Sequence, residues 1–142
     1  MKNFSFALVL SLLFVSPVQA DQPLPEVEIV KSKYQRWQFR NVRTNRTDKG
    51  LVLTGRLNAR IYHGLPRGHV DIAAWSPDGA LIMETTSSYS PGTLSKRLSR
   101  RGGVQFTTDL PELPANTKIM VAFHRDGEQQ TQKPVHEKTV AR

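Results

Sequence analysis

Apolar side chains recur at every second position along several short stretches of this chain, with polar or charged side chains between them. The clearest stretch is 51–61, in which Leu51, Leu53, Gly55 and Leu57 share one parity. Successive side chains of a β-strand point to opposite faces, so this period predicts strands with one buried face. No stretch of the sequence has a sustained apolar period of 3.6 residues, which argues against a helical fold.

Turn signals separate these stretches at intervals of roughly eight to twelve residues. Residues 69–85 contain two apolar runs around Ser-Pro-Asp-Gly, in which Pro presets φ and Gly permits a positive φ, so they are predicted to form a β-hairpin. The other expected strands are 34–42, 51–61, 103–110 and 118–124, with a short edge strand at 94–98. The pattern predicts an all-β fold, a single antiparallel β-sandwich of about seven strands. A small barrel is the alternative, because alternation does not distinguish a closed sheet from two facing sheets.

The first twenty residues, MKNFSFALVLSLLFVSPVQA, have the pattern of a secretory signal peptide. Lys2 supplies the positive start, residues 6–15 are apolar apart from Ser11, and small residues precede the expected cleavage point. An apolar run of about ten residues is too short to span a bilayer. We therefore expect cleavage near Ala20 and a periplasmic or secreted mature protein.

The remaining length fits one domain. We expect a signal peptide at 1–20, a Pro-rich extended leader at 21–33, a β-sandwich domain at 34–126 and a polar C-terminal tail at 127–142. The chain contains no Cys, which excludes disulfides and thiolate metal ligands.

The formal net charge is +8, and Lys2 is the only charged residue that removal of the signal peptide would take away. A positive field of this size attracts acidic partners. For an exported protein these are acidic protein surfaces or envelope polyanions, and nucleic acid is not an expected partner.

Basic residues gather on the solvent parity of two predicted strands and in the connection 86–103. If the two strands pair, their arginines form one cationic face suited to phosphate or carboxylate groups. A Trp on the outer parity of the hairpin is expected to add a protein contact. The alternative is a solvated face with scattered counter-charges. The candidate partner-binding residues are Arg36, Arg40, Arg56, Arg60, Lys96, Arg97, Arg100, Arg101 and Trp75.

The histidine and methionine side chains suggest an alternative function, the binding of copper or zinc in the periplasm, because imidazole and thioether groups are suitable ligands for these metals. No two histidines stand at a ligand interval such as His-x-His, so a site requires a fold that brings His69 beside His124 on neighbouring strands. Asp71 shares the face of His69 and is either a third ligand or a hydrogen-bonding partner. The residues of this alternative site are His63, His69, His124 and Met120.

The sequence contains no Gly-x-Ser-x-Gly motif and no Cys nucleophile. Its carboxylates lie mostly in or beside predicted turns, where turn hydrogen bonds account for them. We therefore predict a protein without catalytic activity and without a cofactor.

Three segments, LTGRLNAR (53–60), HVDIAAWSPDGALI (69–82) and GGVQF (102–106), resemble the FxLyD-type immunoglobulin-like domains of bacterial envelope proteins and a related zinc-ribbon-associated domain. The family's Leu-x-Asp element has no counterpart here, and the connection 85–103 is unusually basic. The resemblance implies an immunoglobulin-like sandwich and an adhesive or scaffolding module rather than an enzyme.

Overall fold

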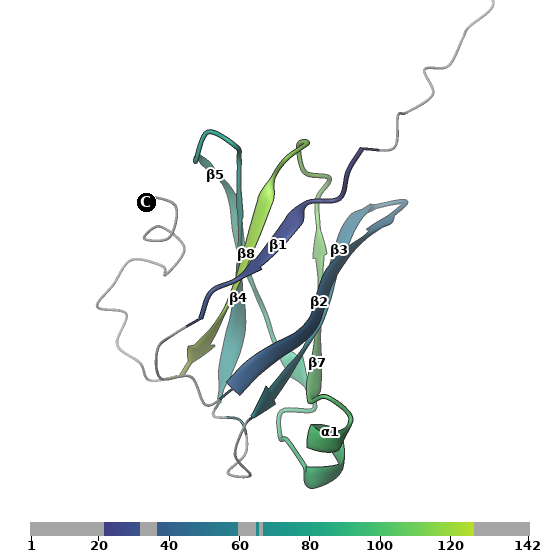
Figure 1. Cartoon of the computed structure of the whole chain (residues 1–142), viewed down its shortest axis with the longest axis vertical. Helices are drawn as coiled ribbons and strands as arrows, with labels where there is room; N and C mark the ends of the chain where they lie inside the picture. Colours follow the sequence, from purple (N-terminus) through teal and green to yellow (C-terminus); the bar gives the residue numbers. More distant parts are fainter. Residues whose placement is uncertain (1–21, 32–36, 60–64, 66, 127–142) are drawn as a thin grey trace, which may run out of the picture.

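The computed structural model describes residues 22–31, 37–59, 65 and 67–126, which form two four-stranded sheets packed face to face (Figure 1). The prediction of an all-β sandwich is confirmed, with eight strands instead of seven. Sheet I has the strand order β1-β8-β4-β5, and sheet II has the order β2-β3-β7-β6. The strands of sheet I are β1 (Glu26–Ile29), β4 (Gly68–Trp75), β5 (Leu81–Ser87) and β8 (Lys118–Arg125). Those of sheet II are β2 (Trp37–Thr47), β3 (Gly50–Ala59), β6 (Tyr89–Ser90) and β7 (Val104–Leu110).

The strand order is that of an immunoglobulin sandwich, with β2, β3, β7 and β6 in the places of strands A, B, E and D. Strands β8, β4 and β5 take the places of F, C and C′. The edge that strand G would occupy is taken by β1, which pairs with β8 in parallel from Glu26 opposite Lys118 to Ile29 opposite Val121. The expected leader 21–33 therefore contributes a strand to the sandwich, and one strand pair is parallel.

The core lies between the sheets and follows the predicted period of two. Leu53 and Leu57 of β3, and Ile119 and Val121 of β8, are each 0% exposed. On β2, Trp37 and Phe39 face this core as predicted, and Trp37 packs edge-on against Phe123 with ring centroids 4.8 Å apart. Burial of these apolar faces is the main favourable contribution to folding.

The outer face of sheet I carries a second, smaller apolar cluster formed by Ala73, Trp75 and Met120, with Val30 packed against it. Trp75 is only 6% exposed. The prediction that Trp75 belongs to an exposed partner surface with the arginines is wrong, because its ring is buried among these neighbours on the sheet opposite β2 and β3.

The predicted hairpin is β4 and β5, joined by Ser76-Pro77-Asp78-Gly79. The Gly79 amide donates to the Ser76 carbonyl at 2.9 Å, and Gly79 has a φ of 84°. The turn therefore uses Gly79 for the backbone conformation that other residues rarely adopt.

The prediction of an edge strand at 94–98 is wrong, because the chain forms the short helix α1 (Lys96–Arg100) there. The Ser95 side chain accepts from the Leu98 amide at 3.2 Å and begins the helix, while the Gly103 amide donates to the Leu98 carbonyl at 2.9 Å and ends it. Leu94, which precedes the N-cap, and Leu98 within the helix both pack against the core. The edge strand beside β7 in sheet II is instead β6.

The predicted signal peptide and C-terminal tail lie outside the described residues. Among the helices of the described part of the chain, none has the length and apolarity needed to cross a membrane.

Candidate functional site

The two predicted basic strands are neighbours in sheet II. Strands β2 and β3 pair antiparallel, with Arg40 directly opposite Arg56. Residues opposite each other in an antiparallel pair point to the same face, so both guanidinium groups lie on the outer face of the sheet. Arg36 and Arg60, which were expected to extend this face, lie outside the described residues.

A β-bulge in β2 adds a third arginine to the face. Between the pairs Arg40–Arg56 and Arg43–Thr54, two residues of β2 oppose the single residue Gly55 of β3. The first of the two, Asn41, has a φ of 51°, a left-handed conformation that Asn tolerates better than most residues.

The extra residue shifts the parity of the strand, so Val42 packs against the core and Arg43 turns outward. Without the bulge, the period of two would bury the charge of Arg43 and expose Val42. The bulge therefore places the guanidinium of Arg43 on the same face as those of Arg40 and Arg56.

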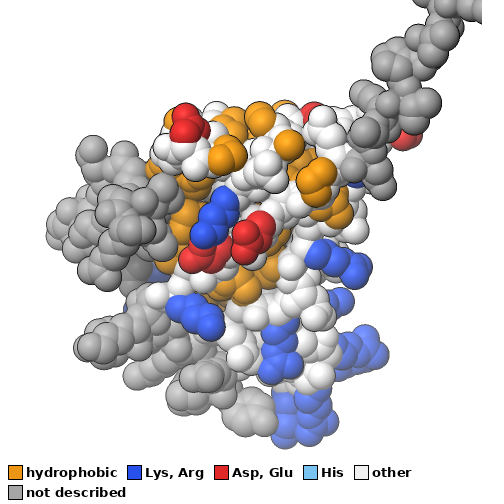
Figure 2. Space-filling model, turned by 45° about the horizontal axis from the view of Figure 1, so that its top comes forward, with side chains coloured by type: hydrophobic (Ala, Val, Ile, Leu, Met, Phe, Trp, Pro, Cys, Tyr) orange, Lys and Arg blue, Asp and Glu red, His pale blue; other side chains and the backbone are white. Residues whose placement is uncertain are grey.

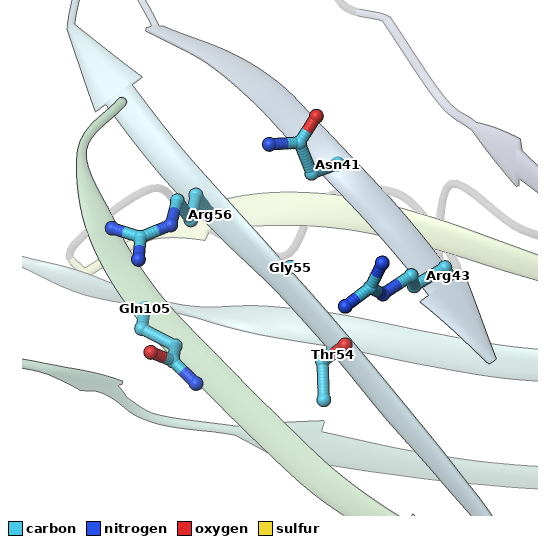
Figure 3. Close-up of a pocket in the computed structure, with 6 residues that line it drawn as sticks. All are labelled: Asn41, Arg43, Thr54, Gly55, Arg56 and Gln105. Atoms are coloured by element: carbon cyan, nitrogen blue, oxygen red, sulfur yellow. The ribbon is translucent and has the colours of Figure 1, made fainter. Parts of the chain in front are cut away.

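A pocket of about 200 Å³ lies where the bulge faces β3 and β7, and none of its lining residues is acidic. Figure 3 shows Gly55 at its centre, with side chains from β2 on one side and from β7 on the other. The lining residues are Asn41, Arg43, Thr54, Gly55, Arg56 and Gln105.

The inner side of Gly55 is filled by the core. A methyl group there would lie 2.4 Å from the Cζ atom of Phe106 and 3.0 Å from Cγ2 of Val42. The ring of Phe106 also packs edge-on against Phe39, with centroids 5.8 Å apart. Gly55 therefore lets Phe106 lie against the backbone under the pocket, a close approach that only a residue without a side chain permits.

Neighbouring polar groups orient two of the three arginines. With its amide turned so that the oxygen faces Arg40, Gln38 accepts from Nε and Nη2 of that guanidinium at 3.1 and 2.7 Å. Nη1 of Arg56 donates to the carbonyl oxygens of Arg101 and Gly103 at 3.4 and 3.3 Å. Carbonyl and amide partners hold the guanidinium groups in place without neutralising their charge.

The basic connection lies beside this pocket, since the carbonyl of Arg101 directly follows α1 and contacts Arg56. The Asn58 amide donates to the Ser99 carbonyl at 3.1 Å, which fixes the helix to β3. The four basic side chains of this segment are exposed and are Lys96, Arg97, Arg100 and Arg101. Lys and Arg side chains gather on this side of the molecule in Figure 2, where Figure 1 places α1.

No carboxylate of the described ranges lies within ion-pair distance of Arg40, Arg43 or Arg56. On the outer face of the β3–β7 pair, the acidic residue nearest to Arg56 is Asp109. It stands opposite Val52, two outward-facing residue pairs away from the pair formed by Arg56 and Gln105. Like charges on neighbouring positions repel, so three uncompensated guanidinium groups form a site at which an added anion would be stabilising.

The histidines of the alternative site are also brought together in part. His69 of β4 stands directly opposite His124 of β8 on the outer face of sheet I, and Asp71 lies beside both rings. Met120 lies farther along β8, buried in the second apolar cluster and opposite Ala73, and is not part of this group. His63 lies outside the described residues.

Five residues of the pocket were not predicted as site residues from the sequence: Asn41, Arg43, Thr54, Gly55 and Gln105. A signal was present for Arg43, because a regular strand in which Phe39 faces the core exposes Val42 and buries Arg43. That conflict, next to an Asn that tolerates positive φ, is typical of a bulge.

Comparison of the chain with protein-family models, curated proteins and solved structures finds no match. The resemblance to FxLyD-type domains therefore stays a prediction.

Proposed function

We propose that this protein is a non-catalytic binding module of the bacterial envelope, which holds the anionic groups of an acidic protein or envelope polyanion in the basic pocket of sheet II. The main supporting observation is that Arg43 and Arg56 line the pocket and Arg40 stands opposite Arg56 on the same face, while none of the three has an acidic partner among the described residues. The signal-peptide pattern of residues 1–20 supports export to the compartment where such partners occur.

The chemistry of the pocket matches oxyanions. Guanidinium groups donate paired hydrogen bonds to carboxylate, phosphate or sulfate oxygens. Asn41, Thr54 and Gln105 add neutral donors around the same space. The exposed basic side chains of α1 extend the positive surface beyond the pocket, which suits a partner with several anionic groups.

The lining supports binding rather than catalysis. It contains guanidinium, amide and hydroxyl groups, and neither an imidazole nor a carboxylate that would serve as a general base. A hydroxyl without a base beside it is a poor nucleophile. We therefore assign the pocket a recognition role.

The test compares two double variants with equal charge. Arg43→Ser/Arg56→Ser removes two guanidinium groups of the pocket, and Arg67→Ser/Arg125→Ser removes two exposed arginines near sheet I. Affinity is measured by calorimetry for poly-glutamate and for heparin, which separate a carboxylate partner from a sulfated polymer. Because each lost charge-assisted hydrogen bond is worth roughly 1.5 kcal/mol or more, the pocket variant should bind at least about tenfold more weakly.

The control variant should bind within about twofold of the wild type, because its charges lie outside the pocket. Equal losses in both variants would show that only net charge matters and would overturn the proposal. Unchanged binding of both polymers by Arg43→Ser/Arg56→Ser would overturn it as well. Thermal unfolding of each variant confirms that the comparison is between folded proteins.

A further inference from the structure

The outer face of sheet I places two imidazoles and one carboxylate around a common point. His69 and His124 are directly opposite each other on β4 and β8, and Asp71 follows His69 by two residues on the same face. The rings are 5.2 Å apart between centroids. Strand pairing fixes the backbone under all three side chains, which gives the group the rigid support that a ligand site needs.

The ligand atoms already stand close to the spacing that a metal ion requires. Nε2 of His69 lies 3.1 Å from Oδ1 of Asp71, and Nδ1 of His124 lies 3.2 Å from Oδ2 of Asp71. All the ligand atoms lie within 4.8 Å of one another. Two ligands of a tetrahedral zinc ion at about 2.0–2.1 Å are roughly 3.3 Å apart, so small side-chain rotations of roughly 1–1.5 Å would bring one oxygen of Asp71 and the two ring nitrogens to the required spacing.

The surroundings favour a cation. The side chains of His69, Asp71 and His124 are 37%, 17% and 23% exposed, which leaves the group open to an ion while partly shielding it from water. A second carboxylate oxygen, Oδ1 of Asp126, lies 3.8 Å from Nδ1 of His69, the ring nitrogen that faces away from Asp71. This is an ion-pair distance, longer than a hydrogen bond, and a small approach of Asp126 would let its carboxylate accept a hydrogen bond from the imidazole and orient the ring.

The floor of the group is small and apolar. Asp71 stands opposite Ala122, which is 5% exposed, so no long side chain competes for the space between the three ligands. The buried Ala73 and Met120 follow along the same face. A low-dielectric floor strengthens the attraction between Asp71 and a bound cation.

We infer that His69, Asp71 and His124 form a binding site for a divalent ion of the zinc or copper(II) class, with Asp126 as a positioning residue. Two imidazoles and one carboxylate are ligands that these ions accept, whereas copper(I) prefers the sulfur ligands that the group lacks. Three protein ligands leave a coordination position open to water or to a donor group of a partner. The site lies on the sheet opposite the basic pocket and does not depend on the proposed function.

The test uses purified protein without a histidine tag, titrated separately with zinc and with copper(II) in a buffer that does not chelate metals. We expect saturable binding of one ion per chain by calorimetry. His69→Ala, His124→Ala and Asp71→Asn should each weaken this binding by at least about 100-fold, and Asp126→Asn by about 10-fold, as outer-shell carboxylates do. With copper(II), electron paramagnetic resonance should show two coordinated imidazole nitrogens, reduced to one in either histidine variant.

His63→Ala and His136→Ala are the matched controls, since each removes one histidine from outside the inferred group. Both should leave the affinity unchanged. Zinc should also raise the unfolding temperature of the wild type and not that of Asp71→Asn, which keeps the side-chain shape. Absence of binding by both ions, or binding that the three ligand variants leave intact, would show that the two imidazoles only share hydrogen bonds with Asp71 and would overturn the inference.

Discussion

Replacing Gly55 with Ala tests the packing on which the basic pocket rests. The added methyl group would lie 2.4 Å from Cζ and 2.6 Å from Cε1 of Phe106, and 3.0 Å from Cγ2 of Val42. Carbon atoms pack at about 3.5–4.0 Å, so the ring of Phe106 must move by roughly 1 Å. The ring is 1% exposed and already packs against Phe39, so it has no vacant space to enter.

The magnitude follows from two opposing effects. Overpacking of a filled core costs about 1–3 kcal/mol. Ala also lowers the conformational entropy of the unfolded chain, which returns roughly 0.4–1 kcal/mol. We therefore expect Gly55→Ala to lower the free energy of unfolding by about 1–2 kcal/mol. Phe106→Leu should relieve the collision, so the double variant should be less destabilised than the sum of the single variants.

Urea unfolding followed by Trp fluorescence measures the effect. With a denaturant dependence of about 2 kcal/mol per molar, the midpoint of Gly55→Ala should fall by roughly 0.5–1 M. Gly92→Ala is the matched control, because no atom lies within 4 Å of the added methyl group, and its midpoint should stay or rise slightly. A Gly55→Ala midpoint at or above that of the wild type would refute the packing argument.

Three further predictions concern the bulge, α1 and the alkaline stability. Asn41→Ile puts a β-branched residue at a φ of 51° and should cost about 1–3 kcal/mol of unfolding free energy in urea. Asn41→Gly, which tolerates this φ, should preserve the stability. Because Arg43 loses its place on the outer face in Asn41→Ile, poly-glutamate affinity should fall further in Asn41→Ile than in Asn41→Gly, which loses only the amide donor of the pocket. Ser95→Ala removes the hydrogen bond accepted from the Leu98 amide and should lower the urea-derived free energy of unfolding by about 1 kcal/mol, an expectation contradicted by an unchanged midpoint. Burial, with the negative charge of Asp126, raises the pKa of Tyr89 above its usual value of 10.0. The folded state favours the neutral phenol, so this stabilisation is complete below pH 10 and is lost as the pH rises through the raised pKa. The unfolding temperature should therefore fall less steeply between about pH 9 and pH 11 in Tyr89→Phe than in the wild type. Identical profiles of unfolding temperature against pH would count against this role of Tyr89.

The alternation of apolar residues was sufficient to predict the inward faces of the central strands. Leu53 and Leu57 of β3, and Ile119 and Val121 of β8, are buried where the period of two placed them. The hairpin turn with Gly79 could also be predicted from the sequence, because turn formation depends on the conformational preferences of a few adjacent residues.

The apolar period of two alone did not predict the bulge, the helix α1 or the burial of Trp75. A single extra residue at Asn41 inverted the parity of the rest of β2 and brought Arg43 to the outer face. Local signals for α1 existed in Ser95 and Gly103, but an edge strand fits the same short apolar spacing. Outward parity did not make Trp75 exposed, because neighbours distant in sequence cover its ring.

The sequence by itself determined which side of each central strand is buried and that the chain carries excess positive charge. Only the tertiary structure decided which strands are neighbours, and with them the meeting of Arg40 with Arg56 in one sheet and of His69 with His124 in the other. The physical reason is that side-chain alternation is a local property of one strand, whereas strand pairing is selected by contacts between residues far apart in the chain.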